Sequence, residues 1–166
     1  MKSRFFSVFL FVACLALAAP STGLSAEVGR QLPSFQAKTM AGTTFDMDAI
    51  IGKKTVMLVF WASWCPSCKS EVPRINALVK KYKPQGMEFI GINIGSNDSP
   101  KRARAFMKKY KMAYPVIFDR SGTISQQYRV LGVPTIIVAD KSGTIQFKNY
   151  GVPKITDNVF KILQSK

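Results

Sequence analysis

The feature that most constrains the fold is an apolar run that leads directly into a pair of cysteines. Residues 56–60 (Val-Met-Leu-Val-Phe) are uninterrupted and partly β-branched, which is typical of a strand buried on both faces. Cys65 and Cys68 follow, and Pro66 between them suits the first turn of a helix. We expect this helix to begin near Cys65, with Ser63 as its N-cap. The chain therefore contains a strand, a cysteine pair and a helix in direct succession.

Strands and helices alternate along the remaining chain. Further strands are predicted at 35–40, 43–46, 89–94, 115–118, 135–139 and 144–150. Apolar residues at helical spacing predict helices after Cys68, around 103–110, at 121–128 and at 155–163. This order predicts one α/β domain with a mixed central sheet.

The spacing of the two cysteines determines what chemistry they can perform. Two sulfurs one helical turn apart can close a disulfide, and the helix N-terminus stabilises a thiolate. We expect Cys65 to be the exposed nucleophile with a low pKa, and Cys68 to be buried and to resolve the mixed disulfide. A disulfide across so short a loop constrains the unfolded chain little, which makes a purely structural bridge the weaker alternative.

The composition excludes several other kinds of site. The chain contains no histidine, so Ser-His-Asp and Cys-His catalysis and histidine-bound metals are excluded. A zinc site would need two further ligands beside Cys65 and Cys68. A Cu(I)-binding module that uses both thiolates stays open as an alternative. We expect no metal and no cofactor.

The N-terminus has the pattern of a secretory signal peptide. Lys2 and Arg4 precede a charge-free apolar stretch at 5–19, and the small residue Ala26 offers a cleavage point. We expect residues 1–26 to be removed and 27–166 to form the domain. Cleavage would lower the formal net charge from +15 to +13 and leave two of the three cysteines. An uncleaved membrane anchor and lipidation at Cys14 are alternatives; both place the domain outside the cytoplasm, where a disulfide persists.

The segment around the two cysteines resembles that of a known family. Residues 64–73 (Trp-Cys-Pro-Ser-Cys-Lys-Ser-Glu-Val-Pro) are similar to the active-site segment of extracytoplasmic thioredoxin-like thiol-disulfide oxidoreductases of the TlpA/ResA/CcmG type. Residues 132–135 (Gly-Val-Pro-Thr) resemble the cis-proline loop of that family. The resemblance covers roughly 30–165. It implies a thioredoxin fold, a mixed central β-sheet flanked by helices, with an N-terminal strand extension and a central insertion.

The resemblance also implies roles for particular residues. Pro134 should follow a cis peptide bond beside the cysteines, and Trp64, Pro66, Val133 and Pro134 are the expected substrate-binding residues. Glu71, three residues after Cys68 and so on the same helix face, matches a glutamate that lies near the cysteines in this subgroup. We assign it the acid/base role toward Cys68. The alternative for Glu71 is a solvated helix carboxylate.

The function that follows is that of an exported reductase of protein disulfides. By family analogy the partners are apocytochrome c, or a copper-site assembly protein, and a membrane electron donor of the DsbD/CcdA type. The same cysteine pair run in reverse would make a disulfide oxidase or isomerase. We expect a monomer in the periplasm or an equivalent extracytoplasmic compartment.

The positive charge has its own interpretation. Six basic residues crowd the segment 101–111, and three more lie at 80–83. They suit a solvated helix face, or attraction to an acidic partner or an anionic membrane surface. Nucleic acid is not expected, because the chain has no interleaved aromatic and basic binding motif.

Overall fold

The centre of the computed structural model, which describes residues 26–166, is a five-stranded sheet. Its strands lie in the order β5-β4-β3-β6-β7. Their bounds are β3 Thr55–Trp61, β4 Met87–Asn93, β5 Val116–Phe118, β6 Thr135–Ala139 and β7 Ile145–Asn149. β3, β4 and β5 are parallel, whereas β6 is antiparallel to β3 and β7 to β6. The predicted α/β class with a mixed sheet is therefore confirmed.

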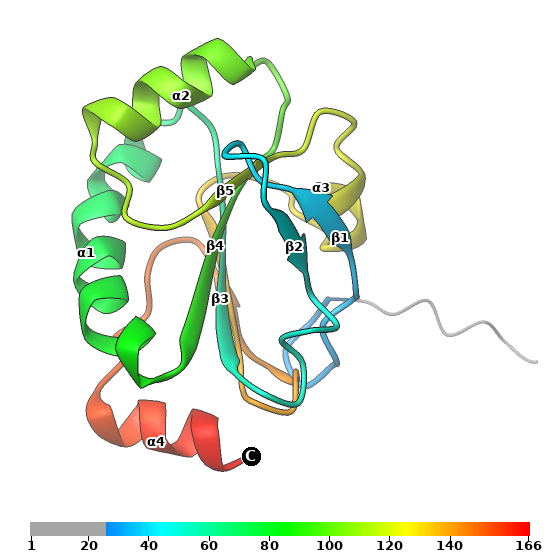
Figure 1. Ribbon diagram of the computed structural model, residues 1–166, viewed down its shortest axis with the longest axis vertical. Helices are drawn as coiled ribbons and strands as arrows, with labels where there is room; N and C mark the ends of the chain where they lie inside the picture. The colour runs from blue at the N-terminus through cyan, green and yellow to red at the C-terminus, as the bar shows by residue number, and fades with distance from the viewer. Residues whose placement is uncertain (1–25) are drawn as a thin grey trace, which may run out of the picture.

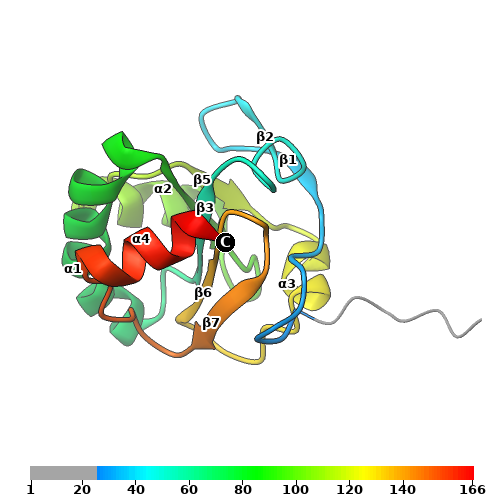
Figure 2. The same cartoon turned by 90° about the horizontal axis from the view of Figure 1, so that it is seen from below.

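Within residues 26–166, four α-helices cover this sheet. They are α1 Pro66–Tyr82, α2 Pro100–Lys109, α3 Thr123–Gln127 and α4 Asp157–Ser165, and a 3₁₀ helix, η1 Lys83–Gln85, follows α1. Helices α1, α2 and α4 lie on one side of the sheet and α3 lies on the other (Figures 1 and 2). An antiparallel hairpin of β1 (Gln36–Lys38) and β2 (Thr44–Asp46) precedes the sheet.

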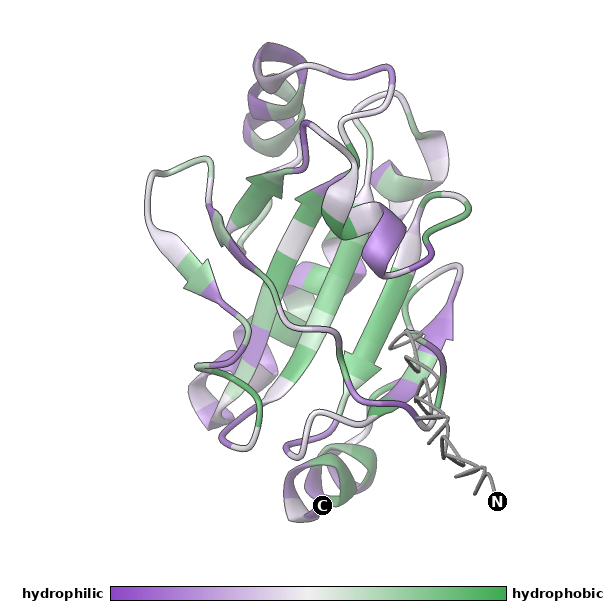
Figure 3. Ribbon diagram, turned by 90° about the vertical axis from the view of Figure 1, so that its right-hand side faces the viewer, coloured by the Kyte–Doolittle hydropathy of each residue, from purple (hydrophilic) through white to green (hydrophobic). Residues whose placement is uncertain are grey.

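The central strand β3 explains why both faces are covered. All seven of its residues are buried, and alternate side chains point to opposite faces. Met57, Val59 and Trp61 pack with the buried side of α1, α2 and α4. Phe60, on the other face, packs against Tyr128, the residue after α3, and the ring centroids are 5.6 Å apart. The resulting apolar sheet is plain in Figure 3.

Helix α1 begins one residue after the predicted point, and with a different cap. Pro66 occupies the first turn, as expected, but the N-cap is Cys65, whose sulfur accepts a hydrogen bond from Cys68 N. The prediction of Ser63 as N-cap is wrong because Asp98 binds the Ser63 side chain instead.

The sheet also decides where a site can form. Because β3, β4 and β5 are parallel, their carboxyl ends meet at one edge, beside the start of α1. The predicted signal peptide lies, except for Ala26, outside the described residues. Within residues 26–166 no helix is both long and apolar enough to cross a membrane.

Candidate active site

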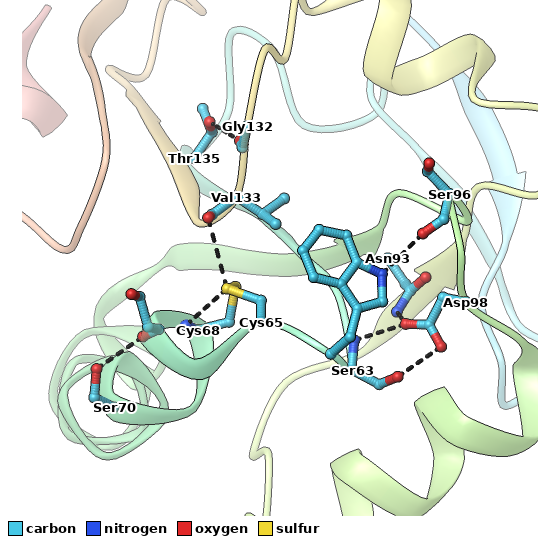
Figure 4. The surroundings of a disulfide bond; sticks show 12 residues. Ser63, Cys65, Cys68, Ser70, Asn93, Ser96, Asp98, Gly132, Val133 and Thr135 are labelled. Atoms are coloured by element: carbon cyan, nitrogen blue, oxygen red, sulfur yellow. Dashed lines mark hydrogen bonds between the residues drawn. A yellow bond between two sulfur atoms is a disulfide. The ribbon is translucent and has the colours of Figure 1, made fainter.

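Cys65 and Cys68 form a disulfide at the N-terminus of α1, where the chain leaves β3 (Figure 4). Their Cα atoms are 5.3 Å apart. The backbone N–H of Cys68 donates to Cys65 Sγ over 3.0 Å. A negative charge that forms on Cys65 when the disulfide opens would meet this N–H and the positive end of the helix dipole.

The burial of Cys65 differs from the sequence expectation. Its exposed fraction is 4%, against 3% for Cys68, so in the disulfide state the two cysteines are equally covered. The loop before β6 explains the difference: the carbonyl oxygen of Val133 lies 3.6 Å from Cys65 Sγ. The predicted contrast between an exposed and a buried cysteine is therefore wrong for this state.

The Val133–Pro134 peptide bond is cis, as the resemblance implied. Pro134 is buried and Val133 is half-buried. The loop is fixed from behind, because Thr135 Oγ1 donates to the carbonyl of Gly132 over 2.6 Å. The structure thus brings Val133 and Pro134, predicted from a motif 69 residues further along, against the cysteine pair.

Trp64 borders a groove beside this loop. Its side chain is half exposed, and Nε1 donates to the carbonyl of Ser96 over 2.9 Å. The groove has a volume of about 390 Å³, and Val133 and Leu131 line it as well. Leu131 is 92% exposed, and sequence reasoning missed it. Pro66 is exposed at the start of α1 but does not line the groove.

A buried carboxylate that sequence reasoning missed holds the segment before the cysteines. Asp98 accepts hydrogen bonds of 2.6 Å from both the N–H and the hydroxyl of Ser63. Asn93 Nδ2 donates to the same carboxylate over 2.8 Å, and so does the N–H of Ser99. Burial alone would raise the pKa of Asp98, but these hydrogen bonds outweigh it and hold the pKa below its usual value.

A signal for this network was present in the chain. Asn93 is the last residue of β4, which the sequence predicted as a strand at 89–94, and polar residues at the carboxyl ends of parallel strands gather at one sheet edge. Because β3 and β4 are parallel neighbours, the loop from Asn93 to Asp98 lies near the end of β3, and so near the cysteines.

Glu71 lies one helical turn beyond Cys68 and is largely covered. Both of its carboxylate oxygens lie 3.2 Å from Arg74 Nη1, and the N–H of Val152 donates to one of them. Arg74 also donates to the carbonyl of Val152. Glu71 is thus not a fully solvated helix carboxylate, since it connects α1 to the loop before α4.

Within residues 26–166, no three Cys, Asp or Glu side chains gather closely enough to hold a metal ion. The polar groups around the cysteines are instead paired with one another, as Ser63, Asn93 and Asp98 show.

Comparison with known proteins gives consistent matches. The AhpC/TSA family profile matches residues 28–148. The thioredoxin-like protein YneN of Bacillus subtilis is 36% identical over 119 residues, which is 71% of this chain and 68% of that protein. The thiol-disulfide oxidoreductase ResA of Bacillus thuringiensis is 34% identical over 119 residues, 72% of this chain and 67% of its own.

A solved structure agrees. A secreted Mycobacterium tuberculosis disulfide oxidoreductase, described as homologous to Escherichia coli DsbE, superposes with a TM-score of 0.64. It is 25% identical, and the match covers 78% of this chain and 93% of that chain.

Proposed function

This chain belongs to the AhpC/TSA family and is a thiol-disulfide oxidoreductase with the thioredoxin fold, and on that premise we propose that it reduces disulfides in partner proteins outside the cytoplasm. The observation that carries the proposal is the Cys65–Cys68 pair at a helix N-terminus, facing the cis Val133–Pro134 peptide. Helix geometry favours the Cys65 thiolate, and the adjacent loop offers a place for an extended substrate segment.

The reaction takes two exchange steps from the reduced dithiol. The Cys65 thiolate attacks one sulfur of the substrate disulfide, forms a mixed disulfide and releases the other substrate sulfur as a thiolate. The Cys68 thiolate then attacks Cys65 Sγ and closes the intrachain disulfide, which frees the second substrate thiolate. Two electrons pass to the substrate, whose two thiolates take up the protons that Cys65 and Cys68 gave up.

Glu71 is proposed as the proton acceptor for Cys68. Its place one helical turn beyond Cys68 and its limited exposure support this role. Arg74 keeps the carboxylate oriented. The role requires the reduced state, in which Cys68 carries a proton.

Trp64, Pro66, Val133 and Pro134 are proposed to contact the substrate. Trp64 and Val133 line the same groove, Pro66 is exposed at the start of the helix, and Pro134 fixes the direction of the loop. Main-chain groups of the loop would pair with an extended segment of the substrate, in the manner of an added strand.

The partners are proposed by family analogy. Apocytochrome c is the proposed substrate, because its haem-attachment cysteines must be reduced, and a membrane protein of the DsbD/CcdA type is the proposed electron donor. Export through a signal peptide at 1–26 is supported by the apolar N-terminal sequence and by the similarity to a secreted oxidoreductase.

Trapping tests the proposal. In cells, the Cys68→Ser variant should accumulate a mixed disulfide between Cys65 and its substrate, and identification of the captured protein names the substrate. Cys65→Ser is the matched control and should capture none. The redox potential separates the two directions: a value near that of DsbA, about −120 mV, favours the oxidase, and a distinctly more negative value favours the reductase.

A further inference from the structure

One exposed surface beside the cysteines carries a strong charge that the redox chemistry does not use. We define it as the basic face: Lys69 on α1 together with Lys101, Arg102, Arg104, Lys108, Lys109 and Lys111 on and just after α2. All seven residues are exposed, and the sequence from Ser99 to Phe118 contains no carboxylate.

Within residues 26–166, a carboxylate pairs with just one of the seven residues of this face. Among residues 26–166 the salt bridges use Lys54, Arg74, Lys81, Arg102 and Lys148 as cations. Only Arg102 belongs to the basic face. Asp119 and Asp140 are buried and accept hydrogen bonds from Ser125 and Thr144, so neither carboxylate pairs with the basic face.

The basic face adjoins the reactive disulfide at both ends of α2. At the N-terminal end, Asp98 pairs with Arg102 and holds Ser63, two residues before Cys65. At the C-terminal end, the ammonium groups of Lys69 and Lys109 both lie 5.6 Å from the ring centre of Tyr110. Lys69 directly follows Cys68 on α1, so one residue of the basic face is the chain neighbour of the cysteine pair.

This position favours a protein partner over a membrane. Because Lys69 follows Cys68 and Asp98 links Arg102 to Ser63, a protein whose disulfide reaches Cys65 meets part of the basic face in the same encounter. A membrane seated on the basic face would instead crowd the approach to Cys65. We propose that the basic face docks an acidic segment next to the disulfide of the partner protein; this rests on the proposed function and specifies its substrate class. Like-signed substrates would be repelled, so the face acts on association more than on chemistry.

The test compares two synthetic peptides that carry the same Cys-x-x-Cys disulfide, one flanked by four Glu and the other by four Lys. The rate constant for oxidation of the reduced protein is measured at 20 mM and 500 mM salt. The protein should react about tenfold faster with the acidic peptide at low salt, and the preference should largely vanish at high salt.

Two variants with equal charge change locate the effect. Lys101→Gln/Lys108→Gln/Lys109→Gln removes three charges from the basic face. Lys53→Gln/Lys141→Gln/Lys166→Gln removes three at the opposite end of the sheet, where Lys141 contacts Gly52 and Leu163. The first variant should lose most of the preference for the acidic peptide, and the second should retain it.

Several outcomes overturn the inference. They are equal rates with both peptides, equal loss in both variants, and binding to vesicles with 30% phosphatidylglycerol that only the basic-face variant loses while its peptide rates stay unchanged. If neither peptide is reduced, the proposed function fails as well. Reduction of both peptides without charge preference overturns the docking inference alone.

Discussion

The carboxylate of Asp98 accepts two hydrogen bonds of 2.6 Å from Ser63, one from its N–H and one from its hydroxyl. It also accepts from Asn93 at the end of β4 and from the N–H of Ser99 at the start of α2. One buried side chain thereby connects the segment before Cys65 to the neighbouring strand and helix.

Replacement of Asp98 by Asn should lower the free energy of unfolding by roughly 2–3 kcal/mol at pH 7. The Asn side chain would place an NH₂ group, which can only donate, against some of the N–H and O–H donors that now bind the carboxylate. The pKa of Asp98 is lowered in the folded state, so its contribution is complete above the unfolded pKa, near 4, and is lost as the pH falls through the folded value. The gap between wild type and variant should narrow below about pH 4.

Denaturant unfolding at pH 7 and at pH 3 measures this gap. Asp48→Asn is the control, since Asp48 is exposed, and it should change stability by less than about 0.5 kcal/mol. A gap for Asp98→Asn that widens in acid would contradict the assigned role.

Replacement of Glu71 by Gln should slow release of the substrate from the mixed disulfide by about 100-fold, the lower range for loss of a general base. The first attack by Cys65 should proceed at the wild-type rate. The Gln oxygen still accepts from Val152 N–H, so the fold is kept. Rapid-quench analysis separates the two steps.

Glu88→Gln removes a carboxylate that pairs with Lys54 at the distant end of β4 and serves as the control. Equal release rates in the two variants would remove Glu71 from the mechanism.

Replacement of Gly95 by Ala should destabilise the loop beside the active site by roughly 3 kcal/mol. Gly95 has a φ of +71°, and an added Cβ would lie 2.3 Å from the carbonyl oxygen of Asp119. Gly122→Ala is the matched control: its φ is +72°, but the nearest neighbour is the end of the Gln126 side chain at 3.8 Å. It should cost only about 1–2 kcal/mol. Thermal unfolding measures the stability of both variants. Equal losses of stability would show that the loop moves to relieve the contact between the added Cβ and the Asp119 carbonyl.

Replacement of Leu131 by Ser should lower kcat/KM for protein disulfides about fivefold. This corresponds to the loss of ~1 kcal/mol of apolar contact between Leu131 and the substrate. The rate with a small aromatic disulfide should not change, because such a molecule is too small to reach from Cys65 across the groove. Ile162→Ser on α4 is the control, since Ile162 is also exposed but lies outside the groove. A parallel loss with both substrates would place Leu131 in the chemistry or the fold, and not in substrate binding.

Much of the fold followed from local pattern. The buried strand before Cys65, the alternation of strands with helices and the cis Val133–Pro134 bond were all predicted, the last from family resemblance. The apolar stripe of α1 was readable because side chains on one helix face recur at a fixed period.

The cap of α1 was a local error with a distant cause. Ser63 is a good N-cap by residue type, but its hydroxyl donates to Asp98, 35 residues further along. Which acceptor a serine finds depends on what the sheet brings beside it.

The sequence by itself determined the chemistry available: two cysteines at a helix start, no histidine and a strong positive charge. Only the tertiary structure decided which residues surround that chemistry. The parallel ends of β3 and β4 bring Asp98 to Ser63, and the antiparallel β6 brings Val133 over Cys65 and covers it. Such contacts depend on strand order and register, which bring together residues far apart in the chain. Neither residue of such a pair belongs to a repeating sequence pattern that would predict the contact.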